Sequence, residues 1–229
     1  MLSVILLAAG SGKRLKTKVS KVVFKLNSRP LVYYSLCTLS RCPEVNEITV
    51  VANAQNIKSI ASVIRKYQIK KVSGIVLGGK RRQDSVANGL KAIDPKTRLV
   101  LIHDGARPFI EKEIISSVIK EAEKRGAAIV GVPVKATIKE ARSKITVKRT
   151  LDRSKLWEIQ TPQVFKKGLI LKAYKKFNRI PATDDAGLVE KLGVRVGIVL
   201  GSYNNIKITT PEDLLLARGI LKGWKAASV

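Results

Sequence analysis

Short apolar strands alternate with amphipathic helical patterns along most of this chain of 229 residues. Strand-like runs are predicted at residues 4–8, 48–52, 72–77, 99–103, 127–132 and 194–200. Helical patterns are predicted at residues 30–41, 57–67, 86–92, 111–125, 168–177 and 186–192. A helix between two strands lets both strands run in the same direction, because it returns the chain to the starting edge of the sheet. The alternation therefore predicts an α/β fold with a mostly parallel sheet flanked by helices.

Residues 134–157 interrupt this alternation. Two short alternating segments, 137–139 and 145–147, flank residues 141–144, a pattern typical of a β-hairpin. A hairpin with so little interior of its own needs a partner to cover it. We therefore expect a single domain over residues 1–229, with a β-arm at about 134–157 that projects from the core and forms a homodimer.

The first predicted strand runs directly into a loop that contains Gly10 and Gly12. Small residues let backbone N–H groups approach an anion closely, and the basic side chains that follow, Arg14 and Lys21 among them, add positive charge. The loop is not a dinucleotide-binding fingerprint, because Leu15 stands where a third small residue is needed. No Gly-x4-Gly-Lys-Ser/Thr sequence is present either. The pattern predicts a phosphate-binding turn of another kind.

A second turn with two glycines precedes the helix predicted at 86–92. Gly78 and Gly79 are followed by three basic residues and then by Asp84 and Ser85. Backbone amides at the start of a helix favour anions, so this turn is a candidate to face a nucleotide. The alternative is a loop with a helix cap, to which Asp84 is equally suited.

Two charged residues follow the strand predicted at 99–103. Ligands of open parallel sheets bind outside the carboxyl ends of the strands, which makes Asp104 and Arg107 candidate site residues. A carboxylate there would suit a divalent metal ion that bridges phosphates. His103, the only histidine, lies within the strand and is predicted to be a core residue without a chemical role.

The last third of the chain contains a polar segment, 160–163, which is predicted to be a loop, and a cap cluster at 183–185. Thr210 and Pro211 then predict a helix start, with acidic residues in its opening turn. Lys207, placed on a short strand just upstream, has no such structural explanation and is a candidate site residue.

The charge balance is strongly basic, since 44 Lys+Arg against 17 Asp+Glu gives +27. Such a charge attracts nucleic acid, anionic lipid or a small polyanion without choosing among them. The bases are spread over the chain and aromatic residues make up only 5%, so no specific nucleic acid partner is expected. No apolar segment approaches the roughly 20 residues of a membrane span. Two cysteines without metal-type spacing fit a cytoplasmic protein.

Six segments, in this order, resemble the 2-C-methyl-D-erythritol 4-phosphate cytidylyltransferases of the non-mevalonate isoprenoid pathway. They are LLAAGSGKRLKTKVSK, LGGKRRQDSVANGL, LIHDGARPFI, TLDRSKLWEIQTPQVF, TDDAGLVEKLG and NNIKITTPEDLLLA. The resemblance implies a Rossmann-like nucleotidyltransferase core, an arm used in homodimerisation, CTP and Mg²⁺ as co-substrates, and release of pyrophosphate. The family's usual proline before the catalytic lysine is replaced here by Ser20, and Lys80 stands where an uncharged or acidic residue is common.

The resemblance also implies roles for individual residues. The catalytic cations would be Arg14, Lys21 and Lys207. The CTP-binding residues would be Ala8, Ala9, Gly10, Gly12, Gly79, Arg82, Ser85 and Asp104, with Asp104 also the metal ligand. The residues that bind the methylerythritol phosphate would be Arg107, Thr137, Arg153, Thr161 and Thr183, with Thr137 and Arg153 supplied by the arm of the other subunit.

Two alternatives stay open at this stage. A cytidylyltransferase of the same superfamily that acts on ribitol 5-phosphate would differ only in the acceptor contacts. A protein that binds nucleic acid through the +27 charge would instead show salt-dependent retention of duplex DNA with sequence discrimination.

Overall fold

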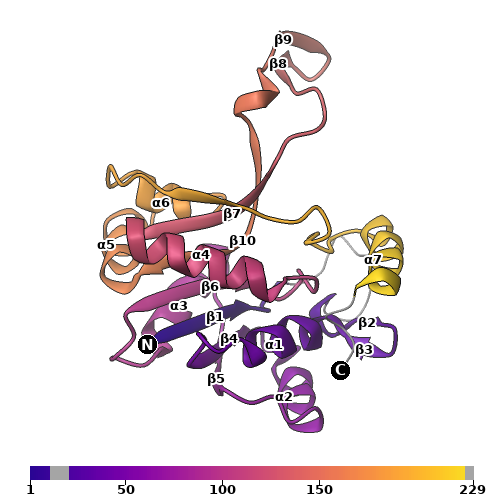
Figure 1. Cartoon of the computed structure of the whole chain (residues 1–229), viewed down its shortest axis with the longest axis vertical. Coiled ribbons are helices and arrows are strands. Elements are labelled where there is room, and N and C mark those ends of the chain that lie inside the picture. Colours follow the sequence, from indigo (N-terminus) through magenta and orange to yellow (C-terminus); the bar gives the residue numbers. More distant parts are fainter. Residues whose placement is uncertain (11–20, 225–229) are drawn as a thin grey trace.

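The computed structural model describes residues 1–10 and 21–224, with the backbone alone at Lys21. Its centre is a seven-stranded sheet in the order β11-β7-β10-β6-β1-β4-β5 (Figure 1). The strands are β1 (Leu2–Leu7), β4 (Glu47–Ala52), β5 (Val72–Leu77), β6 (Leu99–Asp104), β7 (Ala127–Pro133), β10 (Trp157–Lys166) and β11 (Gly197–Leu200). The pairings of β1 with β4 and β6, of β4 with β5 and of β7 with β11 are parallel. Strand β10 alone runs antiparallel to both its neighbours, so the predicted mostly parallel α/β fold is confirmed.

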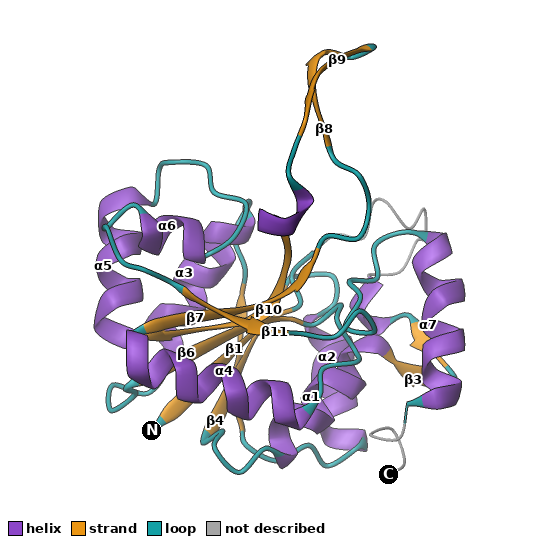
Figure 2. Ribbon diagram, turned by 45° about the horizontal axis from the view of Figure 1, so that its top comes forward, coloured by secondary structure: helices purple, strands orange, loops and turns teal. Residues whose placement is uncertain are grey.

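Helices cover both faces of the sheet, as Figure 2 shows. They are α1 (Leu31–Arg41), α2 (Ile57–Lys66), α3 (Arg82–Ala92), α4 (Lys112–Arg125), α5 (Lys167–Phe177), α6 (Ala186–Glu190) and α7 (Pro211–Gly223). One apolar cluster joins α1, α2, α4 and α7 to residues such as Val4 and Leu6 of β1. A second cluster joins α3, α5 and α6 to the opposite face, which includes Ile5. The alternation of side chains along β1 thus contributes to both interiors.

Helix boundaries follow local capping. Helix α7 begins as predicted, with Pro211 first and the Thr210 hydroxyl accepting the backbone N–H of Asp213 at 3.4 Å. Helix α3 begins at Arg82, four residues before the predicted start. The reason is that the Asp84 carboxylate accepts the backbone N–H of Arg81 at 3.0 Å, which caps the helix upstream of the apolar pattern.

Residues 160–163 are not the predicted loop, because they lie inside β10, where Gln163 pairs with Ile102. The register shifts between Ile159 and Gln163, and the Thr161–Pro162 peptide is cis. The polar side chains here find partners inside the protein. The side-chain amide oxygen of Gln163, Oε1, accepts the backbone N–H groups of Asp185 and Ala186 at 3.1 and 3.2 Å. Polarity therefore misled the prediction for this strand.

Strands β8 (Lys139–Ser143) and β9 (Thr146–Thr150) form an arm that stands away from the sheet in both views (Figures 1 and 2). The arm was predicted, but its strands end later than residues 137–139 and 145–147, and Thr137 precedes β8 instead of lying in it. Its tip is open to solvent, with Ile145 93% exposed. Four short elements complete the described chain: β2 (Lys25–Leu26) and β3 (Arg29–Pro30), which form a hairpin, and the 3₁₀ turns η2 (Lys21–Val23) and η3 (Arg153–Lys155).

Candidate functional site

A cavity of about 380 Å³ opens at the edge of the sheet where β6 ends. Its wall contains six of the residues that the sequence predicted for the site: Arg82, Asp104, Arg107, Thr161, Thr183 and Lys207. They come from α3, the end of β6 and the turn after it, the middle of β10, the loop before α6 and the loop before α7. Residues separated by up to 125 positions in the chain therefore share one cavity.

Asp104 is the last residue of β6 and lies between two cations. Its Oδ2 is 2.6 Å from Lys207 Nζ, and its Oδ1 is 3.5 Å from Arg82 Nε. Burial alone would raise the pKa of Asp104, but Arg82 and Lys207 lower it below its ordinary value. The carboxylate is therefore ionised, and the cluster carries net positive charge.

Lys207 reaches Asp104 because the loop that carries it is fixed at several points. The Arg107 guanidinium donates from Nη1 to the carbonyl of Asn205 at 2.7 Å, and the Ile208 N–H donates to the carbonyl of Ala106 at 2.9 Å. Lys207 was predicted on a strand, but this segment is irregular. Burial lowers the pKa of Arg107, and its Nε has no hydrogen-bond partner within the described part of the chain.

His103 and Thr161 hydrogen-bond to the end of β6 and to the turn that follows it. The Thr161 hydroxyl accepts the backbone N–H of Asp104 at 3.0 Å and lies 3.0 Å from His103 Nδ1. His103 Nε2 is 3.2 Å from the carbonyl of Arg107, which assigns the proton to Nε2 and makes Nδ1 the acceptor of the Thr161 hydroxyl. Burial lowers the pKa of His103 to about 4, so the imidazole is neutral. His103 is a core residue, as predicted.

Ala9, at the start of the first glycine turn, lies against Gly78 of the second turn. A Cβ on Gly78 would be 2.6 Å from the Cβ of Ala9, so only glycine allows this approach. The Gly79 N–H donates to the Ser85 hydroxyl at 3.1 Å, and the carbonyl of Ala8 accepts from Asn56 at 2.8 Å. Gly10 follows as an exposed residue. The structure thus brings the described start of the first predicted CTP-binding turn next to the second, at the ends of β1 and β5.

Three predicted site residues fall wholly or partly outside the described part of the chain. Gly12 and Arg14 lie outside the described residues, as does the side chain of Lys21. Two others lie on the arm and not in the cavity wall: Thr137 is exposed, and Arg153 donates from Nη1 to the carbonyl of Lys135 at 2.7 Å.

A buried ion pair behind Arg82 was missed by the sequence reasoning. Arg82 Nη1 lies 2.8 Å from Oδ2 of Asp185, whose side chain is fully buried. Burial lowers the pKa of Arg82, but Asp185 and Asp104 together raise it above its ordinary value. Asp185 was predicted only as part of a helix cap, and it is Asp184 that accepts a backbone N–H of α6, from Gly187 at 3.1 Å. No sequence signal identifies a partner 103 positions away.

The carboxylate of Asp104 is suited to bind a magnesium ion that is shared with a nucleotide. The described residues contain no group of three or more His, Cys, Asp or Glu side chains that could hold a metal alone. Mg²⁺ is commonly bound through one or two carboxylates together with substrate phosphates, and Asp104 supplies one ionised carboxylate on the cavity wall.

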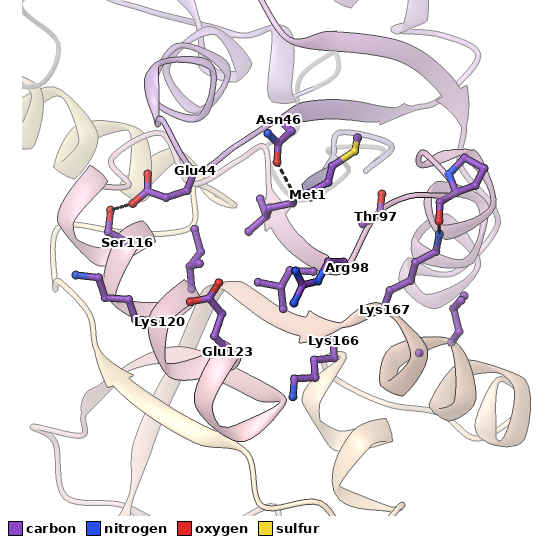
Figure 3. A pocket seen from close by; sticks show the side chains of 16 residues that line it. Met1, Glu44, Asn46, Thr97, Arg98, Ser116, Lys120, Glu123, Lys166 and Lys167 are labelled. Carbon is purple, nitrogen blue, oxygen red and sulfur yellow. Dashed lines mark hydrogen bonds between the residues drawn. The ribbon is translucent and has the colours of Figure 1, made fainter.

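A larger cavity, of about 910 Å³, lies at the opposite end of the strands (Figure 3). Met1, Arg98 and Lys166 are among its lining residues, and none of the predicted site residues is. Within residues 1–10 and 21–224 no helix is long and apolar enough to cross a membrane.

Comparison with known proteins gives a consistent result. A family model described as 2-C-methyl-D-erythritol 4-phosphate cytidylyltransferase matches residues 2–223. The enzyme of that name from Alkaliphilus metalliredigens is 46% identical over 97% of this chain and 94% of its own length. The one from Syntrophus aciditrophicus is 45% identical over 94% of this chain and 93% of its own.

Solved structures agree with these relatives. The 4-diphosphocytidyl-2C-methyl-D-erythritol synthase of Anaerococcus prevotii superposes with a TM-score of 0.86 at 36% identity, covering 96% of each chain. The 2-C-methyl-D-erythritol 4-phosphate cytidylyltransferase of Thermus thermophilus superposes with a TM-score of 0.78 at 30% identity, covering 96% of this chain and 98% of its own. The predicted resemblance is confirmed, and the chain belongs to the 2-C-methyl-D-erythritol 4-phosphate cytidylyltransferase family of nucleotidyltransferases.

Proposed function

We propose that this chain transfers CMP from CTP to 2-C-methyl-D-erythritol 4-phosphate, giving 4-diphosphocytidyl-2-C-methyl-D-erythritol and pyrophosphate. Family membership supports both substrates. The observation that carries the proposal is the Arg82–Asp104–Lys207 cluster, which lines a cavity at the carboxyl end of β6. Ligands of open α/β sheets bind at such an edge.

In the proposed reaction, a phosphate oxygen of the acceptor attacks the α-phosphorus of CTP in line, and pyrophosphate leaves. The nucleophile is already an anion, so the main requirements are alignment and stabilisation of negative charge. Arg14, Lys21 and Lys207 would supply that charge. Two unit charges about 4 Å apart gain ~1 kcal/mol in water but ~4 kcal/mol at a protein-like effective dielectric. Exclusion of water from the cavity would therefore matter as much as the charges.

Asp104 would hold Mg²⁺ together with the phosphates of CTP. A bound Mg²⁺ would stabilise negative charge on the transferred phosphoryl group. The ionised state of Asp104 supports this role, since a protonated carboxyl group would be a poor ligand. Lys207 Nζ lies 2.6 Å from the same carboxylate.

CTP would lie along the two adjacent glycine turns, contacting Ala8, Ala9, Gly10, Gly12, Gly79 and Ser85, with Arg82 and Asp104 at the cavity wall. The acceptor would contact Arg107, Thr161 and Thr183. Thr161 has its hydroxyl committed to Asp104 and His103, so its contribution would be mainly to hold the turn.

Thr137 and Arg153 would complete the acceptor site from the arm of a second copy in a homodimer. The exposure of the arm tip supports this arrangement, because Ile145 and Val147 are 93% and 62% exposed in the single chain.

The single domain over residues 1–229 and the location in the cytoplasm stay predictions. The free thiols of Cys37 and Cys42 are compatible with the cytoplasm.

The substrate assignment is tested by pyrophosphate release with each nucleoside triphosphate, Mg²⁺ and either methylerythritol phosphate or ribitol 5-phosphate. We expect release only with CTP and methylerythritol phosphate. Preference for ribitol 5-phosphate would favour the related cytidylyltransferase activity instead.

The role of Lys21 is tested separately. Lys21→Ala should lower turnover by about 10²- to 10³-fold, the size typical for loss of one preorganised charge or donor at a transition state. Lys172→Ala, which removes an exposed lysine from α5, is the matched control and should keep normal turnover. Near-normal turnover of folded Lys21→Ala would contradict the catalytic assignment.

A further inference from the structure

The carboxylate of Asp185 pairs with Arg82 through a different guanidinium nitrogen from the one that faces Asp104. Its side chain is fully buried and comes from the residue that precedes α6. Its Oδ2 lies 2.8 Å from Arg82 Nη1, while the Tyr174 hydroxyl donates to its Oδ1 at 2.5 Å. We infer that Asp185 is a positioning residue, which holds the Arg82 guanidinium in the orientation needed to bind CTP. This inference rests on the proposed function.

The surroundings of Asp185 fix it before any ligand binds. Oε1 of the Gln163 side chain accepts the backbone N–H groups of Asp185 and Ala186. Tyr174 lies on α5 and packs in the same apolar cluster as Ala186. The two oxygens of the Asp185 carboxylate face different helices: Oδ1 accepts from Tyr174 on α5, and Oδ2 faces Arg82 on α3. A group with this many fixed contacts can hold a neighbouring side chain in one rotamer.

Arg82 is oriented by two carboxylates that occupy different nitrogens. Nη1 faces Asp185 at 2.8 Å, and Nε faces Asp104 at 3.5 Å. The Arg82 side chain is 27% exposed and lines the cavity. The planar guanidinium can therefore keep its buried edge on Asp185 and still offer donors to a ligand.

Stability alone does not account for such a pair. Moving two charges out of water costs free energy that their attraction often only offsets, and apolar replacements of buried ion pairs are frequently as stable. A buried acid beneath an arginine of the cavity wall is better explained by its effect on the orientation of that arginine. Removing the acid would let Arg82 turn toward Asp104, whose Oδ1 lies 3.5 Å from its Nε.

The experiment is a double-mutant cycle on steady-state kinetics, with Asp185→Asn, Arg82→Ala and the combined variant. We expect Asp185→Asn to raise the KM for CTP about 10- to 100-fold, since a misplacement of ~1 Å can cost as much as 10²-fold. The KM for the acceptor should change less than threefold. In the Arg82→Ala background, Asp185→Asn should raise the KM for CTP no further, because the residue it positions is gone.

Unfolding measurements on the same variants give a second readout. Arg82→Ala leaves Asp185 buried without its cation, so the combined variant should unfold at a higher temperature than Arg82→Ala alone. Ile170→Val on α5 is the control for lost stability, since it trims a fully buried side chain of the same cluster without touching a charge. It should lower the unfolding temperature and leave the KM for CTP unchanged.

Tyr174→Phe keeps the test decisive if Asp185→Asn does not fold. It removes only the hydroxyl that fixes Asp185 and should raise the KM for CTP about threefold or more, again with no effect when Arg82 is absent. Equal effects of either variant with and without Arg82, or equal effects on both substrates, would overturn the inference. An unchanged KM for CTP in Arg82→Ala would instead contradict the proposed CTP contact itself.

Discussion

The single histidine of this chain makes its stability sensitive to mild acid. His103 is fully buried, with Nε2 facing the carbonyl of Arg107 and Nδ1 facing the Thr161 hydroxyl. Burial lowers its pKa to about 4, whereas an unfolded histidine has a pKa of about 6.5. Between these values the unfolded chain binds a proton that the folded chain does not, so stability must fall as the pH falls.

The size of this effect follows from the two pKa values. Lowering the pH from 7 to 5 protonates the unfolded imidazole almost completely and the folded one hardly at all, which removes about 2 kcal/mol from the free energy of unfolding. Domains are typically stable by about 5–15 kcal/mol, so the loss is measurable. It corresponds to a fall of about 4–8 °C in the unfolding temperature for a domain of this length.

The assay is urea unfolding at pH 7 and pH 5 of the wild-type protein and of His103→Gln, which cannot titrate in this range. Taking the difference between the two proteins cancels the contributions of the other titratable groups. The wild-type protein should lose about 2 kcal/mol more than the variant. Equal losses in the two proteins would refute the reasoning.

Three further predictions concern the site. Thr161→Val leaves the backbone N–H of Asp104 without its partner and should lower the free energy of unfolding by about 1–3 kcal/mol, whereas Thr161→Ser should restore it; equal stability of the two variants in urea would show that the hydroxyl is dispensable. Gly78→Ala should cost about 1–3 kcal/mol and raise the KM for CTP, because the new methyl group meets Ala9. A similar effect of Gly74→Ala, within β5 and with open space around it, would contradict that explanation. Arg153→Ala should raise the KM for the acceptor much more than that for CTP, and equal changes in both constants would show that Arg153 makes no acceptor contact.

The sheet was predictable because its strands carry their own signal. Buried runs such as β6 are apolar on both faces, which is typical of parallel strands covered by helices, and their carboxyl ends located Asp104 correctly. The start of α7 was equally clear, since Thr210 and Pro211 act through neighbours in the sequence. Local interactions of this kind need no knowledge of the rest of the fold.

Features that depend on distant partners were not predictable. Gln163 looks like a loop residue in the sequence. In the fold, its side-chain amide donates to Asp184 and accepts two backbone N–H groups at the start of α6. Asp185 looks like a helix cap until Arg82 and Tyr174 are brought against it. In both cases a polar residue is buried because its partner comes from elsewhere in the chain. The spacing of residues in the sequence does not predict that pairing.

The arm leaves the sheet on β7 and returns on β10, which lie next to each other. At its base the Val134 N–H donates to the carbonyl of Leu156 at 3.0 Å, and Trp157 pairs with Pro133 just below. The chain thus exits and re-enters at almost the same point. A shorter or longer hairpin could be spliced in at this junction without changing the register of the central strands, so the reach of the arm can vary independently of the nucleotide-binding core.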